Sequence, residues 1–199
     1  MVGSSLVKNA FVEARQSYDG CSLGLKRNNF RVWWQGKGGM SWGELVPRIT
    51  LLLQYEPPKI LVFHCGGNSI GIMPLFHLRR QMKEAILKLH RMLPYTKLVW
   101  SQILPRLSWR YSNNCKAMNM AAVRLNNFAA WLCFKLGGSY IKYPEISWDA
   151  TGMFAKDGVH LSRLGNSIFL FEIQFTLHKL MFWVLMLSIY TRLFFVHLD

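Results

Sequence analysis

A serine, a histidine and an aspartate in this sequence have the types and positions that acyl transfer requires. Ser5 lies in a Gly-Ser-Ser turn near the start of the chain, and Asp157 precedes His160 by three residues. A serine hydroxyl becomes a good nucleophile only when a base removes its proton, which a neutral histidine can do near neutral pH. On a tight loop, the three-residue spacing lets the aspartate carboxylate reach Nδ1 of the histidine. These residues predict a catalytic triad of Ser5, His160 and Asp157.

Two glycine-containing segments could stabilise the negative charge that develops on the substrate oxygen in such a reaction. Gly39 ends a Gly-Lys-Gly-Gly segment, and Asn68 ends a Cys-Gly-Gly-Asn segment. Backbone and side-chain amides that are fixed in advance are suitable donors to an oxyanion. We therefore predict that Gly39, Asn68 and the backbone amide of Ser5 form an oxyanion hole. Each segment alone is common, because a Gly-Gly-Asn run usually forms a turn and paired serines usually cap a helix.

The surrounding sequence supplies elements that would bring these residues to one edge of a sheet. Short apolar runs alternate with longer runs of helical periodicity, which is typical of an α/β fold with helices on both faces of a parallel sheet. In such folds, ligands bind where loops leave the carboxyl ends of the strands. The candidate segments follow successive strands or lie on the last loop, and their order therefore favours one shared site. The predicted strands cover residues 30–34, 59–64, 97–103 and 139–143, and the predicted helices cover residues 6–17, 41–55, 75–92 and 115–136, with a last helix after Ser162.

With these segments in this order, the sequence resembles the SGNH hydrolases, also called GDSL esterases and lipases. The resemblance rests on residues 2–5 (Val-Gly-Ser-Ser), 36–39, 64–68 (His-Cys-Gly-Gly-Asn) and 157–162 (Asp-Gly-Val-His-Leu-Ser), and it runs to about residue 172. It is closest to SGNH-like domains found beside mobile-element sequences in vertebrate genomes. The resemblance implies a flavodoxin-like three-layer α/β/α sandwich. It also implies hydrolysis of a small ester, thioester or acetyl substrate by the predicted triad, with no cofactor.

Three departures from the family pattern bear on this expectation. Ser4 and Ser69 stand where the family has aspartates that help to hold the loops. Only Met1 and Val2 precede the nucleophile turn, whereas a strand typically has about five residues. We therefore expect a truncated first strand and an esterase whose oxyanion geometry and activity are impaired.

The basic composition supports an alternative interpretation. The 199 residues contain 24 Lys and Arg against 10 Asp and Glu, which gives a formal net charge of +14. Many of these cations lie between residues 79 and 135, interleaved with aromatic residues that could stack on bases. The alternative is a catalytically inactive, nucleic-acid-associated domain of mobile-element origin. Solvated helix faces would give the same composition, so charge alone leaves both interpretations open. The candidate nucleic-acid contacts are Arg79, Arg80, Arg106 and Arg110.

The end of the chain departs from the α/β rhythm. Large apolar residues dominate from residue 168, but the longest uncharged stretch covers only residues 180–191, and a spanning helix needs about 20 residues. We predict an SGNH-type domain over residues 1–175 and a hydrophobic extension over residues 176–199, with membrane association through residues 180–196 left open. Widely spaced cysteines and no recognisable signal peptide predict an intracellular protein, cytoplasmic or nuclear. No motif has metal-ligand spacing, so no metal site is predicted, and nothing indicates the oligomeric state.

Overall fold

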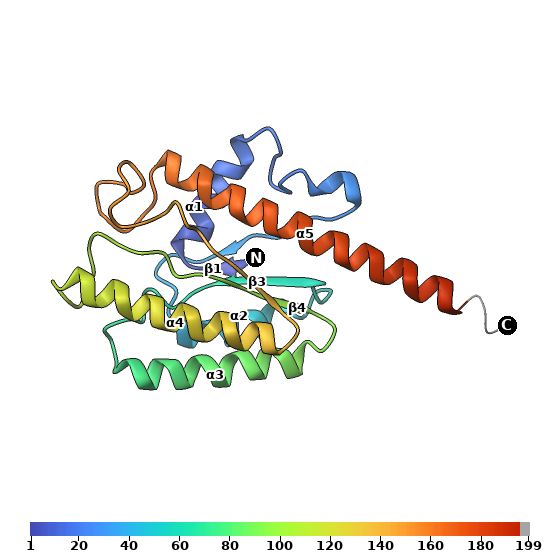
Figure 1. The fold of residues 1–199 in the computed structure, drawn as a ribbon, viewed down its shortest axis with the longest axis horizontal. Helices are drawn as coiled ribbons and strands as arrows, with labels where there is room; N and C mark the ends of the chain where they lie inside the picture. The colour runs from blue at the N-terminus through green and yellow to red at the C-terminus, as the bar shows by residue number, and fades with distance from the viewer. Residues whose placement is uncertain (196–199) are drawn as a thin grey trace.

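The computed structural model describes residues 1–195, with side chains as far as Phe182. Five parallel strands form one sheet in the order β2-β1-β3-β4-β5. Helices on both faces complete a three-layer sandwich, so the predicted α/β fold with a parallel sheet is confirmed (Figure 1). The strands are β1 (Val2–Gly3), β2 (Gln35–Gly36), β3 (Ile60–His64), β4 (Lys97–Ser101) and β5 (Ser139–Ile141).

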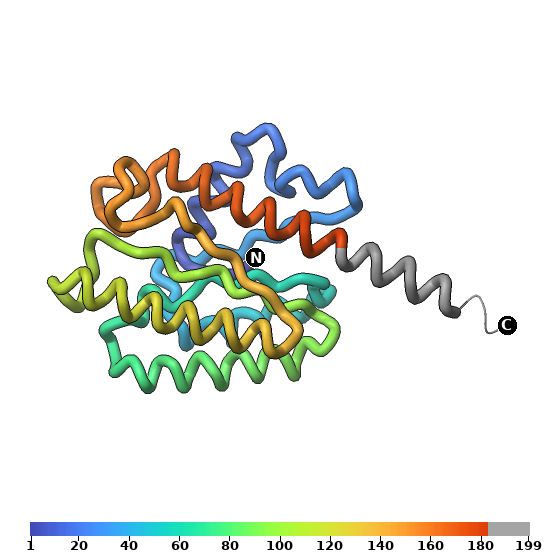
Figure 2. The backbone as a smooth tube through the Cα atoms, in the orientation of Figure 1, coloured from blue at the N-terminus to red at the C-terminus, as the bar shows by residue number. Residues whose placement is uncertain are grey.

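The helices divide between the two faces of the sheet. α1 and α5 lie side by side on one face, and α2, α3 and α4 cover the other (Figure 1, Figure 2). Each face therefore carries its own hydrophobic core, and the strands between them are apolar on both sides. The helices are α1 (Ser5–Gln16), α2 (Leu45–Leu52), α3 (Leu75–Met92), α4 (Cys115–Lys135) and α5 (Arg163–Phe195), with short 3₁₀ helices at Leu25–Asn28 and Trp42–Glu44.

Most predicted elements agree with the structure to within a few residues, but one strand is wrong. The helix predicted over residues 75–92 is α3, whereas no strand forms over residues 30–34. The strand in this region is β2, at Gln35–Gly36. β1 offers partners for these two residues only, in the pairs Val2–Gln35 and Gly3–Gly36. The β-rich residues before them therefore find no neighbouring strand with which to pair.

The first strand, β1, is as short as the sequence suggested, yet it pairs with both of its neighbours in the middle of the sheet. On the β3 side, Val2 pairs with Phe63 and Gly3 pairs with His64. β3 continues past this pairing toward its amino end, so the N-terminus lies part-way along the sheet (Figure 1). A Cβ atom on Gly3 would overlap the carbonyl oxygen of His64, so glycine is what allows the close approach of β1 to β3.

α5 is one continuous helix from Arg163 to Phe195. As predicted, Ser162 caps it, because its hydroxyl accepts a hydrogen bond from the Gly165 N–H at 3.1 Å. Within the described residues, no helix carries an apolar window long enough to cross a bilayer. The predicted boundary after residue 175 falls inside α5 and stays a prediction. Most of residues 180–196, for which the sequence leaves membrane association open, lies outside the described side chains.

Candidate active site

The three residues of the predicted triad form one hydrogen-bonded line at the carboxyl end of the sheet. Ser5 is the first residue of α1 and is separated from β1 by Ser4 alone, whereas Asp157 and His160 lie on the loop before α5. Nε2 of His160 is 2.9 Å from Oγ of Ser5, and Nδ1 of His160 is 2.5 Å from Oδ2 of Asp157. Residues from the two ends of the chain therefore meet in the order that proton transfer from a serine requires.

The start of α1 places the Ser5 hydroxyl at a helix N-terminus that lies close against the sheet. A Cβ atom on Gly36 would overlap the backbone of Lys8, so glycine in β2 makes room for the helix. Ser4 joins the helix to the sheet, because its N–H donates to the carbonyl oxygen of His64 at 3.2 Å. The first backbone N–H groups of a helix have no partner within it, and the helix dipole favours negative charge there. This position suits a serine whose reaction develops an oxyanion.

The loop that carries Asp157 and His160 is organised by the aspartate itself. Oδ1 of Asp157 accepts hydrogen bonds from the backbone N–H groups of Val159 and His160, both at 2.9 Å. The hydrogen bond from the His160 ring is the largest cause that lowers the pKa of Asp157 to about 2, and the backbone donors add to it. The carboxylate is therefore charged at neutral pH, and it holds the imidazole proton on Nδ1 so that Nε2 can accept a proton.

A glycine between these two residues is required by the turn. Gly158 has a φ of 67°, and a Cβ atom there would contact the side chain of Leu107. The Gly158 carbonyl oxygen accepts a hydrogen bond from the Leu107 N–H at 2.8 Å. The loop after β4 thus holds the loop of Asp157 and His160 against the end of the sheet.

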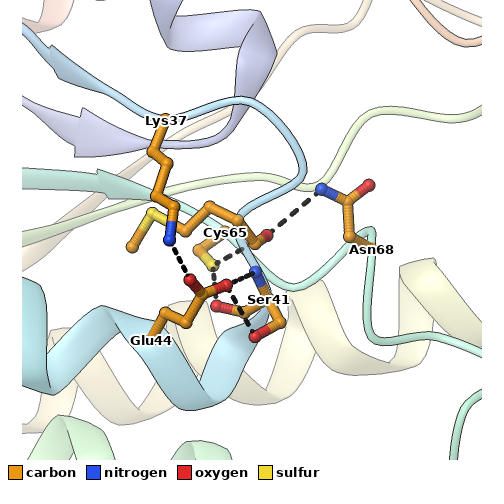
Figure 3. Close-up of polar contacts among 6 residues, drawn as sticks. Lys37, Ser41, Glu44, Cys65 and Asn68 are labelled. Atoms are coloured by element: carbon orange, nitrogen blue, oxygen red, sulfur yellow. Dashed lines mark hydrogen bonds and ion pairs between the residues drawn. The ribbon is translucent and has the colours of Figure 1, made fainter.

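The two predicted oxyanion residues lie on adjacent loops at the carboxyl ends of β2 and β3. Nδ2 of Asn68 donates to the carbonyl oxygen of Met40, the residue after Gly39, at 3.1 Å (Figure 3). A side-chain amide has two N–H donors, so one of them is left for another acceptor. Gly39 is exposed and has a φ of 69°, a conformation that other residues adopt only with strain.

Arg106, on the loop after β4, contacts the site in a way that the sequence did not indicate. The sequence predicts this residue as a nucleic-acid contact, but its Nη2 donates to Oδ1 of Asn68 at 3.0 Å. An arginine side chain has no acceptor, so this contact identifies the Asn68 atom next to Arg106 as the oxygen. The amide nitrogen of Asn68 therefore points away from Arg106. The only signal in the sequence is the position of Arg106 shortly after a predicted strand.

Several contacts hold the Arg106 side chain and backbone in place. Its backbone N–H and carbonyl oxygen both bond to the side chain of Asn119, each at 3.0 Å. The guanidinium lies 4.9 Å from the ring of Trp109, a cation–π contact. A Cβ atom on Gly67 would lie 2.7 Å from Arg106 Nη2, so glycine makes room for the guanidinium. Burial lowers the pKa of Arg106 to about 10, which leaves the side chain charged at neutral pH.

Ser69 holds a loop at the position where the sequence resemblance expects an aspartate. Its Oγ accepts a hydrogen bond from the Trp42 N–H at 2.8 Å, and both residues are buried. The hydroxyl thereby ties the 3₁₀ helix after β2 to the loop after β3. Ser4, at the other departure, makes no side-chain capping bond, and its backbone joins α1 to β3 instead.

A second cluster of polar contacts involves the residues around the Gly39–Met40 turn (Figure 3). The Ser41 N–H donates to Oε2 of Glu44 at 2.8 Å, and Lys37 forms an ion pair with the same carboxylate. The hydrogen bond from Lys37 is the largest cause that lowers the pKa of Glu44 to about 2. The Cys65 thiol donates to the Ser41 carbonyl oxygen at 3.3 Å, and burial raises the pKa of this thiol to about 12. Cys65 is therefore a protonated structural donor rather than a nucleophile.

Several solved bacterial structures share the architecture of this chain. A GDSL-like lipase from Bacteroides thetaiotaomicron has a TM-score of 0.69 and 16% sequence identity, with coverage of 89% of this chain and 86% of the lipase. The chain has the GDSL-like hydrolase fold. A member of the lipolytic G-D-S-L family from Veillonella parvula, at TM-score 0.63 and 13% identity, covers 86% of this chain and 92% of its own. The psychrotrophic esterase EstA from Pseudoalteromonas sp., at TM-score 0.62 and 12% identity, covers 90% and 96%. No protein-family model and no curated protein matches the sequence.

Within this GDSL-like hydrolase fold, a buried chain of hydrogen bonds lies behind the candidate site. Nδ1 of His64, the last residue of β3, is 3.0 Å from Oγ of Ser101, which is 2.6 Å from the hydroxyl of Tyr143. Burial is the largest cause that lowers the pKa of His64 to about 3, and the nearby charge of Arg106 adds to it. His64 is therefore neutral at pH 7, so it adds no positive charge to the candidate site.

The remaining predicted contacts lie on the surface of the GDSL-like fold. Arg79 is exposed on α3, with its guanidinium 4.5 Å from the Phe128 ring of α4, and Arg80 pairs with Glu84 on the same helix at 3.8 Å. Arg110 is exposed on the loop after β4. A nucleic-acid role for these residues stays a prediction. Among the side chains that the structure describes, residues 1–182, there is no group of three or more His, Cys, Asp and Glu arranged for a metal ion.

Proposed function

We propose that this protein is a serine hydrolase that cleaves a small carboxylic ester. The observation that carries the proposal is the continuous line of contacts from Asp157 through His160 to Ser5, at 2.5 and 2.9 Å. The GDSL-like hydrolase fold supports it, because this line lies at the carboxyl end of the sheet, where α/β folds bind ligands. The exposure of the site supports a substrate that approaches from solvent, since the side chains of His160 and Asp157 are 35% and 50% exposed.

The reaction proceeds in two transfers of the acyl group. Oγ of Ser5 attacks the ester carbonyl carbon while Nε2 of His160 takes the hydroxyl proton. The tetrahedral intermediate collapses, the bond to the alkoxy oxygen breaks, and His160 gives its proton to the departing alcohol. Water then attacks the acyl-serine with the same proton relay, which releases the carboxylic acid and restores Ser5. Asp157 stays ionised and stabilises the imidazolium at both stages.

The oxyanion of both intermediates accepts hydrogen bonds from the N–H groups of Gly39 and Ser5 and from the second N–H of Asn68. Arg106 supports this arrangement, because its bond to Oδ1 keeps the Asn68 amide from rotating. The positive guanidinium beside that amide also favours the developing negative charge. Arg106 is thus a positioning residue that acts through Asn68.

The decisive experiment is labelling with a fluorophosphonate, which traps an activated serine. We expect the probe to add once to the folded protein and peptide mapping to place it on Ser5. EstA, which has the same fold, is inhibited by monoethylphosphonate, so the reagent class is suitable. Ser5→Ala should abolish labelling and ester hydrolysis, whereas Ser4→Ala should keep the label. An unlabelled but folded protein, or equal labelling of Ser5→Ala, would overturn the proposal.

A further inference from the structure

The loop after β4 lies between the two halves of the candidate active site. Its residues 102–109 belong to no helix or strand. On one side of the loop, Arg106 donates to the side chain of Asn68 at 3.0 Å. On the other side, the next residue, Leu107, donates its N–H to the carbonyl oxygen of Gly158, in the loop that carries the histidine of the triad. Whatever positions this loop therefore positions an oxyanion donor relative to the base.

Two asparagines of α4 hold the backbone of this loop in the same way. Oδ1 of Asn126 accepts a hydrogen bond from the Ile103 N–H at 2.8 Å, and its Nδ2 donates to the Ile103 carbonyl oxygen at 2.9 Å. Asn119 makes the same pair of bonds with the backbone of Arg106, each at 3.0 Å. Each side-chain amide thus supplies the donor and the acceptor that a neighbouring strand would supply.

The spacing of the two asparagines matches the spacing of the two residues that they hold. Asn119 and Asn126 are seven residues apart, which in an α-helix is about two turns and about 10.5 Å, so both lie on one face of α4. Three residues of extended chain, from Ile103 to Arg106, cover about 10 Å. The loop therefore stays in register with the helix over both pairs of bonds, and it runs in the direction opposite to α4.

Each asparagine oxygen also accepts a hydrogen bond from a tryptophan ring. Trp100 donates to Asn126 at 3.3 Å, and Trp109 donates to Asn119 at 3.0 Å. Because both partners of each oxygen are N–H donors, the orientation of both amides is determined. The ring of Trp109 is also the one that contacts the guanidinium of Arg106, at 4.9 Å. Asn119 therefore holds Arg106 at its backbone directly and at its guanidinium through the indole.

The side chains of the two clamped residues separate the roles of the asparagines. The side chain of Ile103 is buried in the hydrophobic core beneath α2, α3 and α4, whereas the side chain of Arg106 reaches Asn68. We propose that Asn119 is a positioning residue of the esterase reaction, which sets the aim of Asn68 through Arg106. Asn126, with the same bonds, stabilises the fold alone. This inference rests on the proposed function, because the aim of Asn68 matters for the oxyanion.

The mobility of the Asn68 side chain tests the inference without relying on catalysis. In the full chain labelled with ¹⁵N, we expect the order parameter of its amide to fall from about 0.85 toward 0.6 in Asn119→Ala, because Arg106 is then held less firmly. Asn127→Ala, at an exposed asparagine of the same helix, is the matched control and should leave it unchanged. An unchanged order parameter in Asn119→Ala would overturn the inference.

Hydrolysis of p-nitrophenyl acetate by the full chain separates the two asparagines. Asn119→Ala should lower kcat about tenfold with KM within about twofold of the wild type. Asn126→Ala should lower the urea midpoint of unfolding and leave kcat within about twofold. The double variant of Asn119→Ala and Arg106→Met should lose little more than Arg106→Met alone. If the two losses in kcat multiply instead, Asn119 does not act through Arg106 and the inference is wrong.

The two measurements distinguish this inference from the proposed function. A folded wild type that neither hydrolyses esters nor takes the fluorophosphonate label overturns the proposed function, whereas the order parameter of Asn68 still decides whether Asn119 positions that amide. Asn119→Asp is the second variant if Asn119→Ala does not fold. It keeps the size of the side chain and the bonds that Oδ1 accepts, but it loses the donor to the Arg106 carbonyl oxygen. It should also loosen Asn68, and an unchanged Asn68 would again overturn the inference.

Discussion

The two ends of the sheet differ in how closely their residues pack and in which interactions hold them. At the carboxyl end, hydrogen bonds join Ser5 to His160 and Asn68 to Arg106, and the cavity lined by Ser4, His64 and Cys65 has a volume of only about 10 Å³. At the amino end, the strands carry few polar side chains and surround about 590 Å³ of space. Hydrogen bonds between loops fix the positions of the polar groups at the carboxyl end, whereas the amino end encloses open space between apolar side chains. Substitutions should therefore change geometry and chemistry at the first end and packing at the second.

Asp157→Asn should have the largest effect, and it acts only at the carboxyl end. An amide cannot hold the proton on Nδ1 of His160 as a carboxylate does, so we expect kcat for ester hydrolysis to fall by about 10³- to 10⁴-fold. Because the pKa of Asp157 is about 2, the carboxylate itself should not titrate in an activity profile above about pH 4. Steady-state kinetics measure the loss. Asp149→Asn, on an exposed part of the same loop, is the control and should keep the wild-type rate.

Gly3→Ala tests how closely β1 packs against β3 at the carboxyl end of the sheet. The added methyl group would overlap the His64 carbonyl oxygen and the Val7 side chain, so we expect a loss of about 3 kcal/mol in the free energy of unfolding. Gly38→Ala is a matched control, because a Cβ atom there meets nothing within 4 Å. Urea denaturation of both variants measures the difference. Similar stabilities would show that the turn is looser than the structure indicates.

Arg106→Met should have a smaller effect that appears in catalysis rather than in binding. Loss of the bond to Asn68 frees the amide to rotate, so we expect kcat to fall about 10- to 100-fold with little change in KM, less than the loss of an oxyanion donor itself. Arg106→Lys should recover part of the rate, since a lysine can still donate to Oδ1. Arg110→Met, at an exposed arginine nearby, is the control. Equal losses in the two methionine variants would indicate a general effect of charge.

His64→Gln should change how the stability of the protein depends on pH in acid. The pKa of His64 is about 3 in the folded protein against 6.5 as a free side chain, so the unfolded state binds the extra proton between these values. The contribution to stability is therefore complete above about pH 6.5 and is lost as the pH falls toward 3. The wild type should lose about 1.4 kcal/mol more per pH unit than the variant in this window. Parallel curves from denaturant titrations would contradict the buried position of His64.

Sequence reasoning reached the parts of the molecule that depend on local pattern and chain order. The helix at residues 75–92 has a strong apolar period, and Ser5, Asp157 and His160 are recognisable because each type has a distinct role at a strand end. The position of β2 could not be predicted, because it depends on how many residues β1 offers for pairing. The contact of Arg106 with Asn68 depends on a loop fixed by Asn119, and composition alone suggested a different partner.

α5 begins three residues after His160 and lines the cavity at the amino end of the sheet with Leu177, so one helix extends between the two ends of the sheet. At 1.5 Å per residue, Arg163 and Leu177 are about 21 Å apart along the helix axis. Because hydrogen bonds join successive turns of a helix, the burial of Phe169, Ile173 and Leu177 in one core also holds the first turn of α5, which follows the loop of His160.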